Sequence, residues 1–371
     1  MQEIKKRRIV IASVLKPADD PRMFEKIGQS LSTKYEVHCI GSASKTVSNP
    51  DSIQLHLLPP FQRLSLYRLV APIQIFRKIL SLKPALVIFC THELLFIAVA
   101  AKFLVGCRIV YDLQENYWRN IFYGKSFLVF FRPFLAAYVR LKERIASPFV
   151  DYYFLAEKAY AEEMTFVKGK NVVLENKTKR SSLPKPPKKS VEDGNTHLLF
   201  GGTLAETTGV FEAITISKKL YEGNRKIKIT IAGYSHVSAT VARIKNEIRD
   251  YPFIELIGGD TFVSHNLIIS LIQSSDFGII AYPPNPSTSN SIPTKLYEYL
   301  GYQLPILLIN HEPWVKICQP YPAAIPFDPV NFDTLAVQEA MNQQFYQTSP
   351  VDVFWDSEES KLLQTIENLL K

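Results

Sequence analysis

Short apolar runs rich in β-branched residues alternate with longer amphipathic runs along most of the chain, and this alternation is the feature that most constrains its fold. Because strands that alternate with helices form parallel sheets covered on both faces, the pattern predicts an α/β architecture. In the first half, helices such as Pro21–Ser32 and Leu66–Leu82 separate the expected strands Arg8–Val14, Tyr35–Gly41, Ile53–Leu58, Ala85–Cys90, Arg108–Tyr111 and Tyr152–Leu155. In the second half the expected strands are His197–Gly201, Lys228–Ala232, Ile254–Ile257, Phe277–Ala281 and Ile306–Leu308. Two consecutive open α/β domains are therefore predicted, with ligands at the carboxyl ends of their strands.

The charge is divided unevenly along the chain and marks a domain boundary. The 371 residues carry a net charge of +8, but residues 1–190 carry +16 and residues 191–371 carry −8. The change falls within Lys177–Asn195, which is rich in Lys, Ser and Pro and has no apolar period, as is typical of a linker. We expect a first domain over 1–180, a linker over 181–195, a second domain over 196–345, and a C-terminal helix over 346–371 that packs near the domain junction.

Composition and local patterns exclude several protein classes. Hydrophobic residues make up 47% of the chain and no stretch repeats, which excludes disordered and repeat architectures. The longest apolar run, Leu94–Gly106, is too short for a membrane-spanning helix and contains Lys102. Basic residues including Lys5 precede Ile9–Leu15, as in a signal peptide, but no small-residue cleavage site follows, so a first strand is favoured. Four cysteines without close spacing are expected as reduced core residues of a cytoplasmic protein: Cys39, Cys90, Cys107 and Cys318.

One helix start, within residues 289–300, has the residues of an anion site. Asn290 or Ser291 is predicted to cap the helix, and Pro293 suits its first turn. Free N–H groups at this end attract anions, Lys295 adds a full positive charge, and Glu298 follows on the same face. This order suits a nucleoside diphosphate, with Lys295 on phosphate and Glu298 accepting hydrogen bonds from the ribose hydroxyls. The alternative is a surface Lys–Glu pair.

Paired glycines give a second, weaker indication. Gly201 and Gly202 end the first strand of the second domain, where a residue without a Cβ lets the backbone approach a phosphate. Gly258 and Gly259 follow a later strand and are candidates for backbone contacts near the base. A simple turn is the alternative at each pair, and the glycine patterns of P-loops and dinucleotide-binding sites are absent.

Six segments, taken in order, resemble the family 4 glycosyltransferases of the GT-B fold over nearly the whole length. They are Asp19–Lys26, Thr91–Glu93, Val110–Asn116, Val173–Asn176, Gly201–Leu204 with Gly209–Val210, and Pro293–Tyr299. The resemblance implies two Rossmann-like domains facing each other across a cleft, with the acceptor in the first and the donor in the second. It implies transfer of a sugar from a nucleoside diphosphate donor to a glycan or lipid-linked saccharide, with retention, in cell-surface polysaccharide or glycolipid assembly. No DxD motif is apparent, so no metal or other cofactor is expected.

The resemblance also implies roles for individual residues. Catalytic roles fall to Lys295, Glu298 and Asn290, the last placed toward the donor sugar. Donor-binding positions are Gly201, Gly202, Thr203, Gly258, Gly259, Ser291, Thr294, Lys295, Leu296 and Glu298. Acceptor-side positions are Asp19, Asp20, Arg22, His92, Gln114 and Glu115. For Asp20 a helix cap, and for His92 a satisfied strand-end histidine, are alternatives.

Three features depart from the family pattern. Asn290 stands eight residues before Glu298, where members usually carry a second glutamate. Thr203 and Thr208 stand in a loop where many members have Arg and Lys, so Lys295 must carry more of the diphosphate charge. Gln114 replaces the usual histidine of the YDxHE segment. An epimerase or hydrolase on the same fold, and an inactive relative that binds a partner or membrane, therefore remain alternatives.

Residues 116–150 mix aromatic and basic side chains, and 63–78 repeats the pattern. Such stretches can lie in an anionic membrane interface, so the first domain is predicted to dock on the inner membrane leaflet and take a lipid-linked acceptor. Core packing is the alternative for the aromatics Trp118, Phe122, Tyr123, Phe127, Phe130, Phe131, Phe134 and Tyr138. Nucleic acid is not expected as a partner, because no recognised binding module is present.

Overall fold

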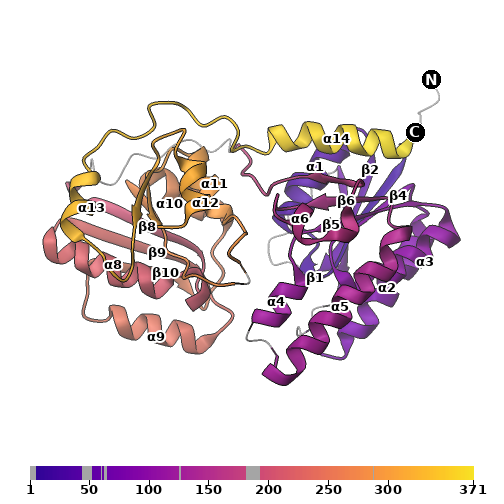
Figure 1. The fold of residues 1–371 in the computed structure, drawn as a ribbon, viewed down its shortest axis with the longest axis horizontal. Helices are drawn as coiled ribbons and strands as arrows, with labels where there is room; N and C mark the ends of the chain where they lie inside the picture. Colours follow the sequence, from indigo (N-terminus) through magenta and orange to yellow (C-terminus); the bar gives the residue numbers. More distant parts are fainter. Residues whose placement is uncertain are drawn as a thin grey trace. The chain divides into compact units, whose positions relative to one another are not determined.

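A computed structural model describes residues 6–43, 52–59, 61, 65–124, 127–180, 193–286 and 288–371 (Figure 1). Most of the predicted linker, 181–192, lies outside these residues, as do Lys5, Arg63 and Lys125. The described chain forms two compact units. Unit 1 takes its residues from Met1–Lys179, Pro286–Ser291 and Trp355–Lys371, and unit 2 from Arg180–Asn285 and Ile292–Phe354.

Unit 1 contains a seven-stranded sheet in the order β3-β2-β1-β4-β5-β6-β7. Every neighbouring pair is parallel. The strands are β1 (Arg8–Pro17), β2 (Glu36–Ser42), β3 (Ile53–Leu58), β4 (Leu86–Phe89), β5 (Arg108–Leu113), β6 (Tyr152–Leu155) and β7 (Asn171–Val173). All six strands predicted from the apolar runs are present, so a doubly wound parallel sheet is confirmed for this unit.

Two helical layers cover the faces of this sheet and define two cores. On one side pack α2 (Tyr67–Leu82), α3 (Leu95–Val105) and α5 (Arg132–Ala146), and on the other η1 (Pro21–Gly28, a π-helix), α1 (Gln29–Ser32) and α14 (Asp356–Leu370). Shorter helical segments are η2 (His92–Leu94), α4 (Tyr117–Tyr123), η3 (Val129–Phe131), η4 (Ser147–Phe149), α6 (Tyr160–Glu163) and η5 (Thr165–Val167). The four cysteines are buried and unbridged.

The C-terminal helix α14 packs on unit 1. Trp355, directly before it, is almost fully buried and donates a hydrogen bond from Nε1 to Ser30 Oγ at 3.0 Å. Glu358, in its first turn, is buried and pairs with Lys177 Nζ at 2.8 Å. These two contacts and the apolar face of α14 fix the end of the chain to the η1 side of the first sheet.

Unit 2 contains a six-stranded parallel sheet in the order β10-β9-β8-β11-β12-β13, built around one hydrophobic core. The strands are β8 (Thr196–Thr203), β9 (Ile227–Tyr234), β10 (Ile254–Gly259), β11 (Phe277–Ile280), β12 (Ile306–Ile309) and β13 (Ala324–Phe327). The helical segments are η6 (Glu206–Thr208), α8 (Val210–Gly223), α9 (Ser238–Ile248), α10 (His265–Ser274), α11 (Thr294–Gly301), α12 (Glu312–Cys318) and α13 (Thr334–Ala340). The five predicted strands are confirmed. β13 was missed, because Pro326 interrupts its apolar pattern at the sheet edge.

A buried ion pair ties η1 to the centre of the first sheet. The Arg22 guanidinium is 3% exposed and contacts both carboxylate oxygens of Asp112, with Nη2 to Oδ1 at 2.8 Å and Nε to Oδ2 at 3.0 Å. Its Nη1 donates to the Leu174 carbonyl at 2.8 Å. Burial acts to lower the pKa of Arg22, but the attraction of Asp112 outweighs it and the pKa is raised. All three nitrogens of the buried Arg22 guanidinium therefore donate hydrogen bonds.

Breaking this pair from one side should be costly. Asp112→Ala leaves the Arg22 guanidinium buried without its counter-charge, and we expect a loss of about 3–5 kcal/mol in the free energy of unfolding. Urea unfolding of the full chain measures the loss. The control is Asp260→Ala, which removes one partner of the exposed Lys245–Asp260 pair and should change stability by less than about 0.5 kcal/mol. Equal effects of the two substitutions would contradict the assignment.

Candidate functional site

A row of glycines lies across the carboxyl ends of three neighbouring strands in unit 2. Gly202 of β8 is in register with Gly233 of β9, which is in register with Gly258 of β10. A Cβ on Gly233 would lie 1.7 Å from the Gly202 carbonyl oxygen, and one on Gly258 would lie 2.3 Å from the Gly233 carbonyl oxygen. Gly202 and Gly258 also have φ of +118° and +90°, which favour glycine. At these three positions the strands therefore carry no side chain of their own that would keep a ligand from the backbone.

Lys295 is the cation beside this row. It lies in the first turn of α11, and a Cβ on Gly202 would be 3.1 Å from Lys295 Cε. The predicted neighbours, the glycine pair of β8 and the lysine of α11, are thus brought together from positions more than ninety residues apart. Gly209, at φ +81°, packs against the Ala281 carbonyl just after β11, which fixes the loop that leaves β8. This loop lies where the strand order of the sheet reverses, the usual ligand position in such sheets.

Two neighbouring side chains contact the carboxylate of Glu298. Lys295 Nζ bonds its Oε2, and His265 Nε2 lies 3.3 Å from its Oε1. Burial acts to raise the pKa of this carboxyl, but Lys295 and His265 outweigh burial and lower the pKa to about 2. Glu298 is therefore an ionised carboxylate with its side chain 12% exposed, unlike an ordinary surface Lys–Glu pair.

Sequence reasoning missed two members of this site. Gly233 ends β9 as a single glycine, so it lacked the pairing that drew attention to the other strands. His265 begins α10 after Ser264, whose Oγ accepts from the Leu267 N–H and caps the helix. The Ser264-His265 pair at a helix start after Gly258 and Gly259 was the available indication, because a helix that follows a strand begins at the carboxyl edge.

The remaining residues predicted to bind the donor differ in their exposure. Gly259 ends β10, Gly201 is buried within β8, and Thr203 and Thr294 are exposed. Leu296 requires a correction: its side chain is fully buried in the core, and its N–H donates to the Pro293 carbonyl. Leu296 therefore anchors α11 from below, and no atom in its side chain is available to a donor.

The predicted cap of α11 is wrong. Pro293 occupies the N-cap position, and no side chain caps the helix. Asn290 and Ser291 belong to the short segment grouped with unit 1, where Asn290 Nδ2 donates to Glu163 Oε1 at 2.7 Å. The helix begins directly after this proline, at Thr294, so Asn290 and Ser291 lie too far before its first turn to cap it. A contact of Asn290 with the donor sugar stays a prediction.

On the acceptor side, two predictions have structural explanations. Asp20 caps η1, because its Oδ1 accepts from the N–H groups of Arg22 and Met23 at 3.0 and 3.1 Å. Arg22, expected at the accessible acceptor side, is instead buried against Asp112 because its charge needs that partner. Asp19 is half-buried after β1. The motif that contains these residues therefore secures the first helix to the sheet.

Gln114 and Glu115 follow β5 at its carboxyl end. Gln114 Nε2 donates to Asp112 Oδ2 at 2.6 Å, and its Oε1 accepts from Lys16 Nζ at the end of β1. The amide of Gln114 can donate to the Asp112 carboxylate and accept from the Lys16 ammonium at the same time. A histidine in this place could do both in only one of its two neutral tautomers. Glu115 is half-buried, and its Oε2 accepts from Asn120 Nδ2 at 2.9 Å.

His92 lies in a partly buried charge cluster after β4. Its Nδ1 lies 3.1 Å from Lys142 Nζ, and Glu93 next to it is bonded by Arg68 Nε at 2.9 Å. Burial is the main cause that lowers the pKa of His92 to about 4, with Glu93 opposing and Lys142 and Arg68 contributing, so the ring is neutral at physiological pH. The Lys142 contact matches the alternative of a histidine satisfied by a neighbour.

Comparison with known proteins was made at the level of sequence and of structure. No protein-family model and no curated protein matches the sequence. Sucrose-phosphate synthase from Thermosynechococcus elongatus superposes with a TM-score of 0.71 at 11% identity, covering 98% of this chain and 99% of that chain. HepE of Anabaena in complex with UDP gives 0.65 at 12% identity over 97% and 100%. A trehalose 6-phosphate synthase from Burkholderia multivorans gives 0.60 at 11% identity over 99% and 95%.

These similarities show the fold. Two parallel sheets with doubly wound strand orders confirm the predicted pair of Rossmann-like domains, and the chain has the GT-B fold of the proteins it superposes on. Within the described ranges, no helix is both long and apolar enough to cross a membrane. The same ranges contain no group of three or more His, Cys, Asp or Glu side chains placed to hold a metal.

One buried carboxyl in unit 1 should give stability a dependence on pH. Glu143 of α5 is 1% exposed, with Arg140 Nη1 3.0 Å from Oε2 and the Tyr111 hydroxyl 3.4 Å from Oε1. Burial raises its pKa to about 7, although Arg140, Tyr111 and Lys142 each act to lower it. The protonated form is therefore favoured by folding. The stability it contributes is complete below about pH 4.5, the value for an unperturbed glutamate, and is lost as pH rises through about 7.

Glu143→Gln keeps this side chain neutral at every pH. We expect the melting temperature of the variant to exceed that of the unsubstituted protein by a difference that grows from pH 5 to pH 8. Differential scanning calorimetry across this range makes the comparison, with the exposed Glu312→Gln as the control for loss of one carboxylate. Melting curves of Glu143→Gln and the unsubstituted protein that stay parallel from pH 5 to pH 8 would rule out titration of Glu143.

Proposed function

We propose that this chain is a glycosyltransferase that moves a sugar from a nucleoside diphosphate donor to a saccharide or lipid-linked saccharide acceptor. The observation that carries the proposal is the Lys295–Glu298 pair beside Gly202, at the glycine-lined strand ends of unit 2. The proteins that share the fold support it. HepE has been determined with UDP and with UDP-glucose, and a further match is a trehalose-6-phosphate synthase analysed for glycosyl transfer with retention.

Different residues of unit 2 bind the ribose and the diphosphate of the donor in this proposal. Glu298 is ionised at neutral pH, so both oxygens can accept hydrogen bonds from the two ribose hydroxyls. Lys295 places its ammonium beside Gly202, where the backbone is open to a diphosphate. Without donor the two side chains neutralise each other, and a diphosphate would give Lys295 a second anionic partner. His265 then keeps one oxygen of Glu298 in position.

Catalysis in this proposal depends on charge and position. Negative charge develops on the leaving diphosphate as the bond to the sugar breaks, and Lys295 with the backbone N–H groups near Gly202 stabilises that charge. The acceptor hydroxyl attacks from the face that the diphosphate leaves, so configuration is retained and no covalent intermediate is needed. Asn290 is assigned to the donor sugar, and holding donor and acceptor in register supplies the remaining rate enhancement.

A second part of the proposal concerns the outer face of unit 1, which is unusually apolar. Helices α2, α3 and α5 lie side by side (Figure 1), and α3 is hydrophobic around its whole circumference apart from Lys102. The sheet buries only the inner side of each helix, and none of the eight aromatics predicted in 116–150 is buried. The side chains left exposed on these helices and on η3 are Leu69, Val70, Ile73, Phe96, Phe103, Leu104, Val129, Phe130, Phe131, Phe134, Tyr138, Leu141 and Ile145.

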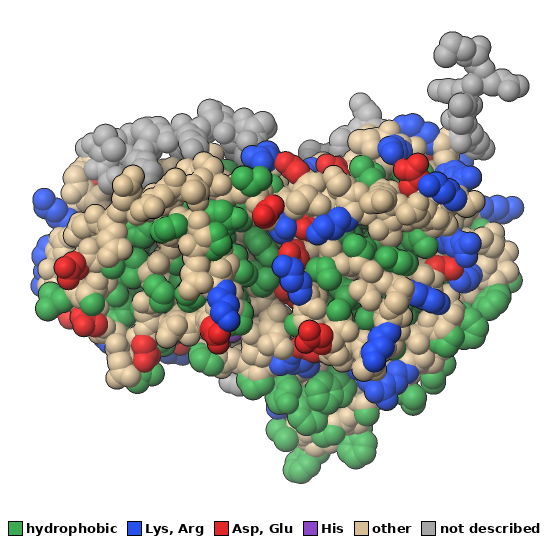
Figure 2. Space-filling model, turned by 45° about the horizontal axis from the view of Figure 1, so that its top comes forward, with side chains coloured by type: hydrophobic (Ala, Val, Ile, Leu, Met, Phe, Trp, Pro, Cys, Tyr) green, Lys and Arg blue, Asp and Glu red, His purple; other side chains and the backbone are tan. Residues whose placement is uncertain are grey.

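Figure 2 shows hydrophobic side chains gathered at the lower edge of this unit, where η3 and α5 begin. The charges of the same helices are of one sign. α2, α3 and α5 carry eight basic residues, and their single acid, Glu143, is buried. The basic residues are Arg68, Arg77, Lys78, Lys102, Arg132, Arg140, Lys142 and Arg144. An apolar face flanked by cations suits an anionic membrane surface. We place unit 1 on the inner face of the cell membrane, in assembly of a cell-surface polysaccharide or glycolipid.

Removal of the ribose-binding carboxylate tests the donor site. Isothermal titration of the purified chain with UDP, GDP, ADP, CMP and TDP, without metal and then with Mg²⁺, should show saturable binding of one nucleotide. Glu298→Gln should weaken that binding by about 2 kcal/mol, because charge-assisted hydrogen bonds are lost. Glu312→Gln, which disrupts an exposed Lys–Glu pair in the same unit, is the matched control. Unchanged affinity in Glu298→Gln would show that the ribose assignment is wrong.

Vesicle flotation tests the membrane face. We expect the chain to float with phosphatidylcholine vesicles that contain phosphatidylserine and to remain unbound with phosphatidylcholine alone. The double variant Phe130→Ser/Phe134→Ser should lower the partition coefficient by more than ~10-fold, since two exposed aromatic rings no longer enter the interface. The control Phe262→Ser/Val330→Ser removes two exposed apolar side chains from unit 2. Flotation that is independent of anionic lipid, or equally weakened by both double variants, would refute this part.

A further inference from the structure

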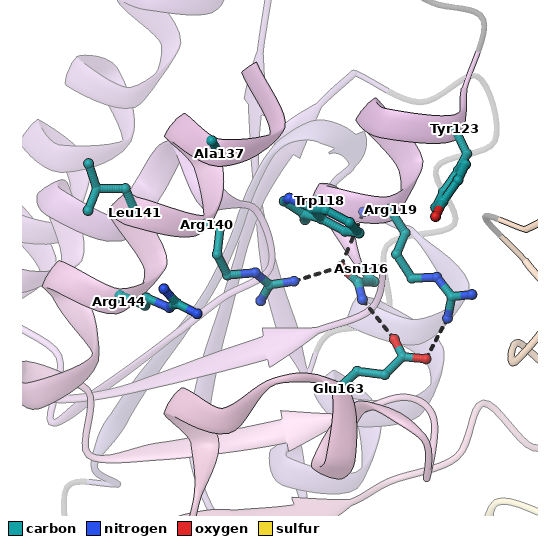
Figure 3. A pocket seen from close by; sticks show the side chains of 9 residues that line it. All are labelled: Asn116, Trp118, Arg119, Tyr123, Ala137, Arg140, Leu141, Arg144 and Glu163. Atoms are coloured by element: carbon teal, nitrogen blue, oxygen red, sulfur yellow. Dashed lines mark hydrogen bonds and ion pairs between the residues drawn. The ribbon is translucent and has the colours of Figure 1, made fainter. Parts of the chain in front are cut away.

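A cavity of about 840 Å³ lies between α4 and α5 in unit 1 (Figure 3). Three arginines reach it, Arg119 from α4 and Arg140 and Arg144 from successive turns of α5. Trp118 and Leu141 supply apolar walls. Its size is that of a site for a small organic molecule, well beyond what one phosphate ion fills.

Not all the positive charge of the cavity is neutralised. Arg119 pairs with Glu163, and Arg140 pairs with the buried Glu143 at 3.0 Å. The side chain of Arg144 is exposed to the cavity and forms no hydrogen bond or ion pair with any residue in the described ranges. Arg140 and Arg144 are four residues apart, so they share one face of α5 and present two guanidinium groups in the same direction. An anion would complete this arrangement.

The polar wall of the cavity is already ordered. Asn116 is 4% exposed, and its Oδ1 accepts from Arg140 Nη2 at 2.9 Å. Its Nδ2 donates to Glu163 Oε2 at 2.7 Å, and Glu163 Oε1 accepts from Arg119. This chain of contacts holds Arg119 and Arg140 on opposite sides of Asn116, as Figure 3 shows. Fixed guanidinium groups lose little conformational entropy on binding, and they recognise phosphate oxygens in a defined geometry.

The apolar wall continues out of the cavity onto the surface. Leu141 lines the cavity and is itself 56% exposed. On α5 it belongs to an exposed stripe with Phe134, Tyr138 and Ile145, spaced four, three and four residues apart. This stripe is part of the apolar face of α2, α3 and α5. A ligand with an anionic head in the cavity would therefore have an apolar surface along which a hydrocarbon chain could lie.

We propose that the α4–α5 cavity binds the phosphate or diphosphate group of a lipid, with its hydrocarbon chain along the exposed stripe of α5. Arg144 and Arg140 contact the phosphate oxygens, and Trp118 and Leu141 contact the first part of the chain. This inference rests on the proposed function in one respect, that the lipid is the carrier of the saccharide acceptor. A soluble sugar phosphate shares the anionic head and lacks the chain, so the two sources can be separated by experiment.

The test is to titrate the full chain with farnesyl phosphate, inorganic phosphate and farnesol. Binding is measured by calorimetry and by tryptophan fluorescence. Trp118 lies in the cavity, whereas Trp314 and Trp355 are buried elsewhere, so a fluorescence change is expected on binding. Farnesyl phosphate should bind at least about tenfold more tightly than either partial ligand. Arg144→Gln should weaken it about tenfold, and Arg225→Gln, which removes an exposed arginine from unit 2, should leave it unchanged.

The outcomes separate this inference from the proposed function. Equal affinity for inorganic phosphate and farnesyl phosphate would overturn the lipid assignment, and equal affinity for farnesol and farnesyl phosphate would overturn the anion site. Loss of binding in Arg225→Gln to the same extent as in Arg144→Gln would show general charge attraction and also overturn it. If the chain binds a nucleotide through Glu298 but does not bind farnesyl phosphate, only the lipid-phosphate assignment of the cavity is refuted. Farnesyl phosphate binding that depends on Arg144, in a chain that binds no nucleotide, refutes only the donor site.

Discussion

Parallel pairing of every strand is the constraint on which the rest of the structure depends. A parallel pair needs a crossover, and in this chain most crossovers carry helices that cover the sheet faces. All strands of a sheet then end at one edge, and loops that leave this edge bring distant parts of the sequence together. In unit 2 the loops after β8, β9 and β10 meet there with the start of α11. The topology of the sheet therefore determines where the candidate donor site lies.

The two sheets use this edge in opposite ways. In unit 2 three neighbouring strands have glycines near their carboxyl ends, and the side chains beside them are Lys295, Glu298 and His265. In unit 1 the corresponding edge is filled by hydrogen-bonded polar side chains, with Lys16, Gln114 and Asp112 in one connected group. An edge without side chains admits the backbone contacts that a diphosphate needs, whereas the filled edge makes the first sheet rigid. The exposed guanidinium of Arg144 lies instead at the cavity between α4 and α5.

Much of the fold could be predicted because apolar runs report burial directly. Two predicted strands, Ile53–Leu58 and Tyr152–Leu155, match the structure at both ends, since turn-forming residues or polar residues bound them. Prediction failed where a partner decided the outcome. Arg22 could not be recognised as buried without Asp112, ninety residues away, and Leu296 could not be told from a ligand contact without the core beneath α11. Lys295 and Glu298 were found from local spacing, but His265 approaches them only through the fold.

The helices of unit 1 carry more large apolar side chains than their packing against the sheet requires. A helix that is apolar on all sides is normally buried on all sides. α3 is covered by the sheet on one side and by α2 and α5 at its flanks, yet Phe96, Phe103 and Leu104 remain exposed. Neither sheet packing nor helix propensity requires large hydrophobic residues there, because alanines already fill the inner contacts at Ala98 and Ala101. A nonaqueous neighbour, the membrane surface proposed above, would account for the outer side chains. The same neighbour would deliver a lipid phosphate to the arginines of α5, so the apolar face and the basic cavity follow from one environment.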